Sequence, residues 1–141
     1  MTTSKFSSFV AIDPGLRGCG VAKFFDGFME KAAYVENSQK TGRGPPAWAA
    51  MASMCWGASR MVLEVPQIYP GMPKTDPNDL LDLAGVLGAI VGLHDPVDIA
   101  WVHPAHWKGQ TPKAVMNNRV LSKLDPVEKS RIQDAGALTH N

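Results

Sequence analysis

The alternation of apolar and polar positions predicts five β-strands, three at the start of the chain and two further along it. Apolar runs cover residues 7–12, 19–25 and 28–36, and each has the length of a strand. Asp26-Gly27 between the second and third runs is a strong signal for a two-residue hairpin. Two later apolar runs, 60–65 and 97–103, each end at a proline and predict two more strands.

Helical spacing of apolar residues predicts two helices between the later strands. The first begins at Pro45-Pro46, and its apolar or small residues at helical spacing are Trp48, Met51, Ala52, Cys55 and Ser59. The second covers 77–93, where Asp76 can cap the first turn and Pro77 fits its first position. The apolar stripe of this second helix is Leu80, Leu83, Ala84, Leu87, Ile90 and Val91.

The last part of the chain predicts a loop followed by two helices. Residues 104–111 have the composition of a loop, and helices are expected at 112–124 and 126–139. Thr111-Pro112 and Asp125-Pro126 each combine a capping residue with a proline, and Glu128 completes a capping box at the second. The predicted order β-β-β-α-β-α-β-α-α indicates an α/β fold: a mixed five-stranded sheet, antiparallel on one side and parallel on the other, flanked by helices.

Composition indicates one soluble domain, with a local rather than a global basic charge. The chain has 141 residues, 45% hydrophobic and 19% charged, and a net charge of +1. Residues 101–131 nevertheless carry six cations against Asp125 and Glu128. This basic third allows a local anionic partner, although a solvated helix face would have the same composition.

Cysteine usage and hydropathy indicate a reduced, cytoplasmic setting. Cys19 and Cys55 show no metal-type spacing and make no disulfide framework. The N-terminus lacks the apolar stretch of a secretory signal. The longest apolar region, 80–93, is broken by Asp82 and is too short to span a bilayer, so no membrane partner is expected.

Two carboxylates follow apolar runs that the predicted sheet can place side by side. Asp13 ends the first strand, and Glu64 lies near the end of the fourth. Ligands of open α/β sheets gather at the carboxyl ends of strands, so both side chains are expected in one cleft. Carboxylates about 4 Å apart repel by roughly 4 kcal/mol at an effective dielectric of 20, and a hard divalent cation, Mg²⁺ or Mn²⁺, relieves that repulsion. An ordinary β-turn at Asp13 and a partly exposed acid at Glu64 are the alternatives.

Glycines follow the first carboxylate closely. Gly15, Gly18 and Gly20 are expected to keep the turn free of side chains, so that a phosphate can approach the backbone.

These motifs resemble a known family. "VAIDPGLRGCGVA" is similar to the opening motif of the RuvC-type Holliday junction resolvases, which have the ribonuclease H-like fold, and "VLEVP" falls where that family carries its second acid. "HPAHWKG", "PKAVMNNRV" and the terminal "LTHN" resemble phage and phage-like members. The resemblance covers nearly the whole chain.

The resemblance implies a homodimeric, Mg²⁺-dependent endonuclease of a bacterial or phage-infected cell that cuts symmetric phosphodiesters in four-way or other branched DNA. It would use no small-molecule cofactor. Asp13 and Glu64 match the metal-binding carboxylates and would hold two ions, roughly 3.5–4 Å apart, with Asp13 bridging both. The family's further acids would lie beyond Asn141, so residues 1–141 are expected to be a single nuclease domain without the end of its last helix. Asp134 is the nearby substitute.

The same resemblance implies DNA contacts. Lys108 and Lys113 match catalytic basic positions after the fifth strand, and Arg119 extends that basic region. In the loop after Glu64, Tyr69 is the candidate for an aromatic wedge and Lys74 for a phosphate contact. Exposed lysines at a helix start and a tyrosine that anchors its own loop are the alternatives.

Two other functions fit parts of the sequence. A non-catalytic junction-binding protein would keep the fold and lose an acid. "DPGLRGCG" also resembles the first phosphate loop of actin- and hexokinase-like ATPases, but those are built from two domains, whereas a single domain is expected here.

Glycines also recur inside the 77–93 helix. Gly85, Gly88 and Gly92 share one face, each at a cost of about 1 kcal/mol in helix propensity. Close backbone approach would offset that cost, with the sheet as the expected partner and a second subunit's helix as the alternative.

Overall fold

The structure is a computed structural model that describes residues 8–37, 47–66, 76–96, 98–107 and 111–134. Its centre is a five-stranded sheet in the order β3-β2-β1-β4-β5. The strands are β1 (Ser8–Asp13), β2 (Gly18–Phe25), β3 (Phe28–Glu36), β4 (Arg60–Glu64) and β5 (Asp98–Val102). The pairs β1–β2 and β2–β3 are antiparallel, whereas β1–β4 and β4–β5 are parallel. The predicted mixed sheet is therefore confirmed.

The hairpin between β2 and β3 forms where it was expected. Asp26 and Gly27 both have positive φ, 50° and 80°. A two-residue turn of this kind matches the twist of the strands, and aspartate and glycine tolerate its left-handed backbone better than other residues.

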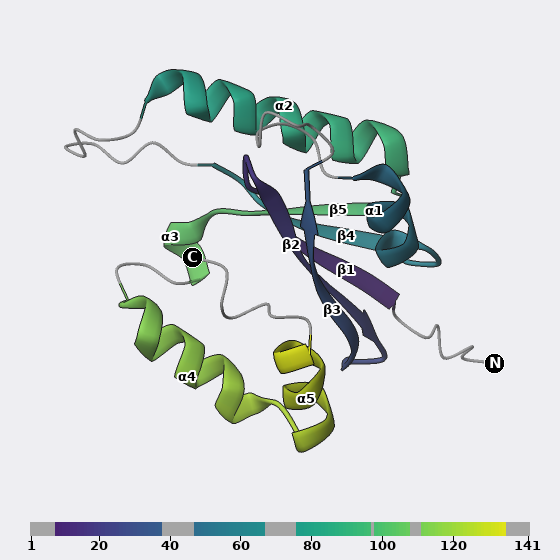
Figure 1. Ribbon diagram of the computed structural model, residues 1–141, viewed down its shortest axis with the longest axis vertical. Helices are drawn as coiled ribbons and strands as arrows, with labels where there is room; N and C mark the ends of the chain where they lie inside the picture. Colours follow the sequence, from purple (N-terminus) through teal and green to yellow (C-terminus); the bar gives the residue numbers. More distant parts are fainter. Residues whose placement is uncertain (1–7, 38–46, 67–75, 97, 108–110, 135–141) are drawn as a thin grey trace.

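Helices cover both faces of the sheet, as Figure 1 shows. On one side lie α1 (Trp48–Cys55) and α2 (Pro77–His94). On the other lie α4 (Lys113–Lys123) and α5 (Pro126–Asp134), preceded by the short α3 (Pro104–Trp107). Among the described residues, no helix has the length and hydropathy needed to cross a membrane.

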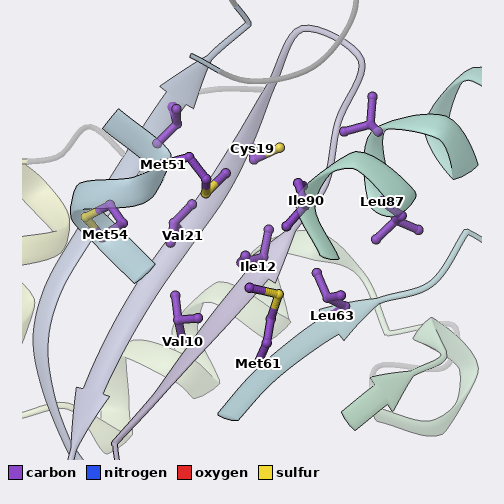
Figure 2. Close-up of a cluster of buried hydrophobic side chains, with 12 residues drawn as sticks. Val10, Ile12, Cys19, Val21, Met51, Met54, Met61, Leu63, Leu87 and Ile90 are labelled. Atoms are coloured by element: carbon purple, nitrogen blue, oxygen red, sulfur yellow. The ribbon is translucent and has the colours of Figure 1, made fainter. Parts of the chain in front are cut away.

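The core lies between the sheet and α1–α2 (Figure 2). Because strand residues alternate between faces, Val10 and Ile12 of β1 point to the same side as Met61 and Leu63 of β4. Their partners from the helices are Met51, Met54, Val86, Leu87 and Ile90. Because Asp13 follows Ile12 and Glu64 follows Leu63, the same alternation places both carboxylates on the opposite face.

The helix termini agree in part with the sequence prediction. The Asp76 carboxylate accepts a hydrogen bond from the Asn78 N–H at 2.9 Å, as a capping residue should. The capping box is also present: Asp125 N–H donates to Glu128 Oε1 at 3.1 Å, and Glu128 N–H donates to Asp125 Oδ1 at 2.8 Å. The expected cap at Thr111 is wrong, because Pro112 occupies the cap position of α4 and makes no side-chain capping bond.

Other helix predictions need correction. Residues 104–107 form α3 rather than a loop, since proline suits a first helical turn. The first helix ends at Cys55, followed by Gly57 with φ of 75°, so Ser59 lies outside it. Ala52 and Ala84 are exposed, whereas Val86, outside the predicted stripe, is buried. For α5, the described part ends at Asp134, and the predicted extension to 139 lies outside the described residues.

Candidate active site

Strand register brings Asp13 and Glu64 together. In the parallel β1–β4 pair, Ile12 lies opposite Leu63, so the next position places Asp13 beside Glu64. Neighbouring strands are about 4.8 Å apart. Both carboxylates occupy the face away from the core, where Asp13 is exposed and Glu64 half-buried. The predicted meeting of the two side chains at one edge of the sheet is therefore supported by the register.

The two carboxylates belong to a row of residues that crosses all five strands, which we call the acidic row. Asp13 pairs with Gly20 of β2, which pairs in turn with Tyr34 of β3. On the other side, Glu64 pairs with Val102 of β5. The row thus reads Tyr34, Gly20, Asp13, Glu64 and Val102, and its two acids are next to each other at its centre.

A cavity of about 550 Å³ opens beside the acidic row, between the sheet and the α4–α5 layer. Asp13 and Glu64 contribute to its lining, together with small side chains of the sheet. The sheet contributes Ala11, Ala22 and Val62, and the helices contribute Val120 and Ile132. Such an apolar wall lowers the local dielectric, which strengthens every electrostatic interaction of the two carboxylates.

The donor set fits a magnesium ion. Mg²⁺ prefers oxygen ligands and is typically held by one or two carboxylates, with waters and substrate phosphates completing its shell. Asp13 and Glu64 supply two such groups from rigid strand ends. No cluster of three or more His, Cys, Asp or Glu suited to a metal occurs in the described part of the chain. One or two carboxylates are what a Mg²⁺ site usually takes from the protein, so Asp13 and Glu64 fit such a site.

Two of the glycines after Asp13 are required by close backbone contacts within the protein. A Cβ on Gly15 would lie 2.5 Å from the Gly18 carbonyl oxygen, and one on Gly18 would lie 2.7 Å from the Val35 carbonyl oxygen. Both positions require glycine because a backbone carbonyl, that of Gly18 in the first case and that of Val35 on β3 in the second, lies too close for a side chain. At Gly20 the nearest atom is Asp13 Cβ, at an ordinary 3.7 Å. Approach of a phosphate to this loop stays a prediction.

The two cysteines do not offer a nucleophile to this site. Burial raises the pKa of the Cys19 thiol; a hydrogen bond with the Gly15 backbone opposes this rise, and the charge of Asp13 adds to it. Burial likewise raises the pKa of Cys55 to about 11. Both thiols are therefore protonated at neutral pH and unreactive.

The predicted DNA-binding residues are only partly within the described structure. Lys113 is the first residue of α4, Arg119 lies on the same helix, and both are exposed. Tyr69, Lys74 and Lys108 lie outside the described residues, as does the side chain of Asp134.

Two residues near the carboxylates escaped the sequence analysis. Tyr34 stands at the end of the acidic row, and Arg17 is exposed in the β1–β2 loop. The sequence could have indicated Arg17, because it is a basic residue within the motif "DPGLRG" that follows the first strand. Tyr34 could have been found by aligning the three strands of the meander through its hairpin.

Comparison with known proteins identifies the fold. No protein-family model matches the sequence, and a search of curated proteins finds no match either. Among solved structures, Thermus thermophilus RuvC in complex with a Holliday junction substrate matches with a TM-score of 0.55 at 15% identity, covering 95% of this chain and 92% of that chain. Another Thermus thermophilus RuvC structure matches with a TM-score of 0.54 at 17% identity, covering 94% and 92%.

These neighbours confirm the predicted fold class. The chain has the ribonuclease H-like α/β fold of RuvC, in agreement with the resemblance of its motifs. The narrower likeness to phage members stays a prediction.

Proposed function

We propose that the protein is a metal-dependent, structure-selective endonuclease that cleaves phosphodiesters in Holliday junctions or other branched DNA. The observation that carries this proposal is the position of Asp13 and Glu64, adjacent at the ends of β1 and β4 beside a cavity. Supporting it, the chain shares its fold with a RuvC structure solved with a Holliday junction substrate. Within the cell, such an enzyme would act in the cytoplasm of a bacterium or phage-infected host.

In this proposal, Asp13 and Glu64 would hold two Mg²⁺ ions, for which Mn²⁺ could substitute. When bound, such ions would supply Lewis-acid charge and lower the pKa of a coordinated water. The chain's own part is to hold the two carboxylates rigidly, because each belongs to a paired strand of the sheet. The apolar wall of the cavity reduces screening by water on the side of the carboxylates that faces it.

Basic residues would hold the DNA backbone around this centre. Lys113 and Arg119 present exposed cations on α4, the helix that faces the cavity through Val120. Together with Lys108 and Lys74, they would contact phosphates, and Tyr69 would stack on an unpaired base at the branch. Such contacts fix the position of the DNA without reading its sequence.

The test is cleavage of a labelled synthetic four-way junction by the protein of the complete reading frame. We expect cutting in Mg²⁺ or Mn²⁺, none in EDTA, and little on a linear duplex of the same sequence. Cleavage should depend on a divalent metal because the negatively charged phosphate is repelled by two carboxylates whose charge is not compensated. Tight junction binding without cutting in either metal would instead support a non-catalytic junction-binding protein.

We further propose that the exposed face of α2 joins two subunits. Among the described residues, nothing lies within 4 Å of Cβ atoms added to Gly85, Gly88 and Gly92, so the expected packing of these glycines against the sheet is wrong. Leu81 and Leu93 flank them with 70% and 61% of their surfaces exposed. In an antiparallel pairing about a twofold axis, the small residues cross at the centre and each leucine meets the partner helix, as a self-complementary interface requires.

Charge on this face should separate the subunits. We expect Leu81→Glu to shift the protein from dimer to monomer in sedimentation velocity, because two like charges would be buried across the axis. Val127→Glu is the matched control, since Val127 is 53% exposed on α5 and should leave the dimer intact. A wild-type protein that sediments as a monomer at high concentration would contradict the interface.

A further inference from the structure

The acidic row has an open position between its carboxylates and its aromatic end. Gly20 lies between Asp13 and Tyr34 in the register and carries no side chain. In the part of the chain that the structure describes, the one atom within 4 Å of a Cβ placed there would be the Cβ of Asp13, at 3.7 Å. The sheet surface between Asp13 and Tyr34 is therefore bare backbone, which a flat or extended group can approach closely.

Tyr34 borders this bare surface in a well-defined position. Its ring lies over Gly18, whose added Cβ would come within 2.8 Å of the Tyr34 Cζ and 2.9 Å of Cε1. Val35 next to it is buried in the core, so alternation directs Tyr34 to the face of Asp13. The ring is half-buried, which leaves part of it accessible to a ligand.

Arg17 stands at the same edge of the sheet on a loop that is held in place. Its carbonyl accepts hydrogen bonds from both the backbone N–H and the side-chain amide of Asn37, each at 3.0 Å. The same amide also donates to the Leu16 carbonyl at 3.3 Å. The backbone is thus fixed, while the Arg17 side chain is exposed.

The position of Arg17 relative to the carboxylates follows from the strand register. Gly20 is level with Asp13, and β2 begins two residues earlier, at Gly18. A strand rises about 3.3 Å per residue, so Gly18 lies about 7 Å beyond the acidic row and Arg17 lies just past it. From that distance an arginine side chain is long enough to contact a group next to the one held at Asp13 and Glu64.

We propose that Arg17 and Tyr34 form a nucleotide-binding subsite beside the carboxylates. Arg17 binds the phosphate adjacent to the scissile one, because a guanidinium matches phosphate in charge and in paired hydrogen bonds. Tyr34 stacks on the unpaired base of that nucleotide, above the bare backbone at Gly20. That the ligand is a strand of branched DNA rests on the proposed function. The subsite would bind the nucleotide next to the scissile phosphate on the surface of β2 and β3.

The phosphate contact is tested by the salt dependence of junction binding, measured by fluorescence anisotropy with the full chain in EDTA. Each phosphate contact contributes about 0.7–0.9 to the slope of log K against log salt. Arg17→Gln should lower the slope by about one contact and weaken binding on every junction sequence. Arg60→Gln is the control, because Arg60 is also exposed but is paired with Asp98 at 2.6 Å at the other end of β4.

The stacking contact is tested by a pair of variants that keep the packing over Gly18. Tyr34→Leu retains apolar volume but offers no aromatic face, and it should weaken junction binding about tenfold. Tyr34→Phe keeps the ring and should bind like the wild type. Unchanged melting temperatures for both variants exclude a folding defect as the cause.

The outcomes separate this inference from the proposed nuclease activity. If the wild type cuts junctions, but Arg17→Gln binds with the same slope as Arg60→Gln, the phosphate contact is overturned. If Tyr34→Leu binds as tightly as Tyr34→Phe, the stacking contact is overturned. If the wild type never cuts, yet Arg17→Gln lowers the slope and Tyr34→Leu weakens binding, the subsite stands and the nuclease proposal fails.

Discussion

Asp13→Asn is expected to lower the rate of junction cleavage by about 10³-fold or more while leaving junction binding intact. The amide has nearly the same shape as the carboxylate but carries no charge, so it is a poor ligand for a hard divalent cation. Loss of one preorganised charge-stabilising group from an active site costs about 10²–10³ in rate, and loss of the metal costs more. Single-turnover cleavage of a labelled four-way junction in Mg²⁺ measures this directly.

The fold should survive this change, which makes the result interpretable. Asp13 is exposed, and substitutions at exposed positions usually alter stability by about 0.5 kcal/mol or less. Binding should even strengthen slightly, because one negative charge is removed beside the DNA phosphate. Glu64→Gln should behave in the same way, since its register position is next to Asp13.

Asp98→Asn provides the matched control for both variants. Asp98 is also an exposed strand carboxylate, but it begins β5 and pairs with Arg60, far along the sheet from the acidic row. Its replacement should leave the cleavage rate within about twofold of the wild type, because a surface ion pair contributes little. Cleavage by Asp13→Asn at a rate close to that of Asp98→Asn would rule out the proposed site.

The sheet and the carboxylate pair could be predicted because both depend on local patterns. Apolar runs bounded by Gly, Pro and Asp-Gly located all five strands, and parallel strands place their carboxyl ends at one edge. Asp13 and Glu64 each directly follow such a run. Their meeting therefore needed only the assumption that these two strands are neighbours.

Helix faces and loop packing could not be predicted in the same way. Whether Ala84 or Val86 faces the core depends on how α2 lies across the sheet, which the 3.6-residue period does not determine. Gly15 and Gly18 are as compatible with phosphate binding as with tight packing until the neighbouring Val35 carbonyl is located. Tyr34 and Arg17 can be placed near the carboxylates only when the pairing register of β1, β2 and β3 is known.

The attachment of α5 to the sheet is a contact of this long-range kind, and it depends on the buried side chain of Glu128. Glu128 is buried, and its Oε2 accepts a hydrogen bond from the Met29 N–H of β3 at 2.9 Å, across 99 residues of sequence. Its Oε1 at the same time accepts from the Asp125 N–H in the capping box. Arg131 donates to the Met29 carbonyl, so α5 satisfies both backbone groups of this edge-strand residue.

Glu128→Ala is expected to lower the free energy of unfolding by about 2–4 kcal/mol. A buried N–H left without a partner costs about 1–3 kcal/mol, and a lost helix cap costs about 0.5–2 kcal/mol. Urea denaturation followed by circular dichroism measures the change. Glu128→Gln keeps an acceptor oxygen and a side chain that capping boxes accept, so it should lose less stability than alanine.

Glu30→Ala isolates the buried contacts from any general effect of removing an acid. Glu30 is an exposed carboxylate of the same strand, one residue from Met29, and its loss should change the unfolding free energy by about 0.5 kcal/mol or less. Equal losses in Glu128→Ala and Glu30→Ala would show that the Met29 contact does not hold α5. A larger loss in Glu128→Ala should be accompanied by slower junction cleavage, because α5 carries Ile132 in the wall of the cavity beside Asp13 and Glu64.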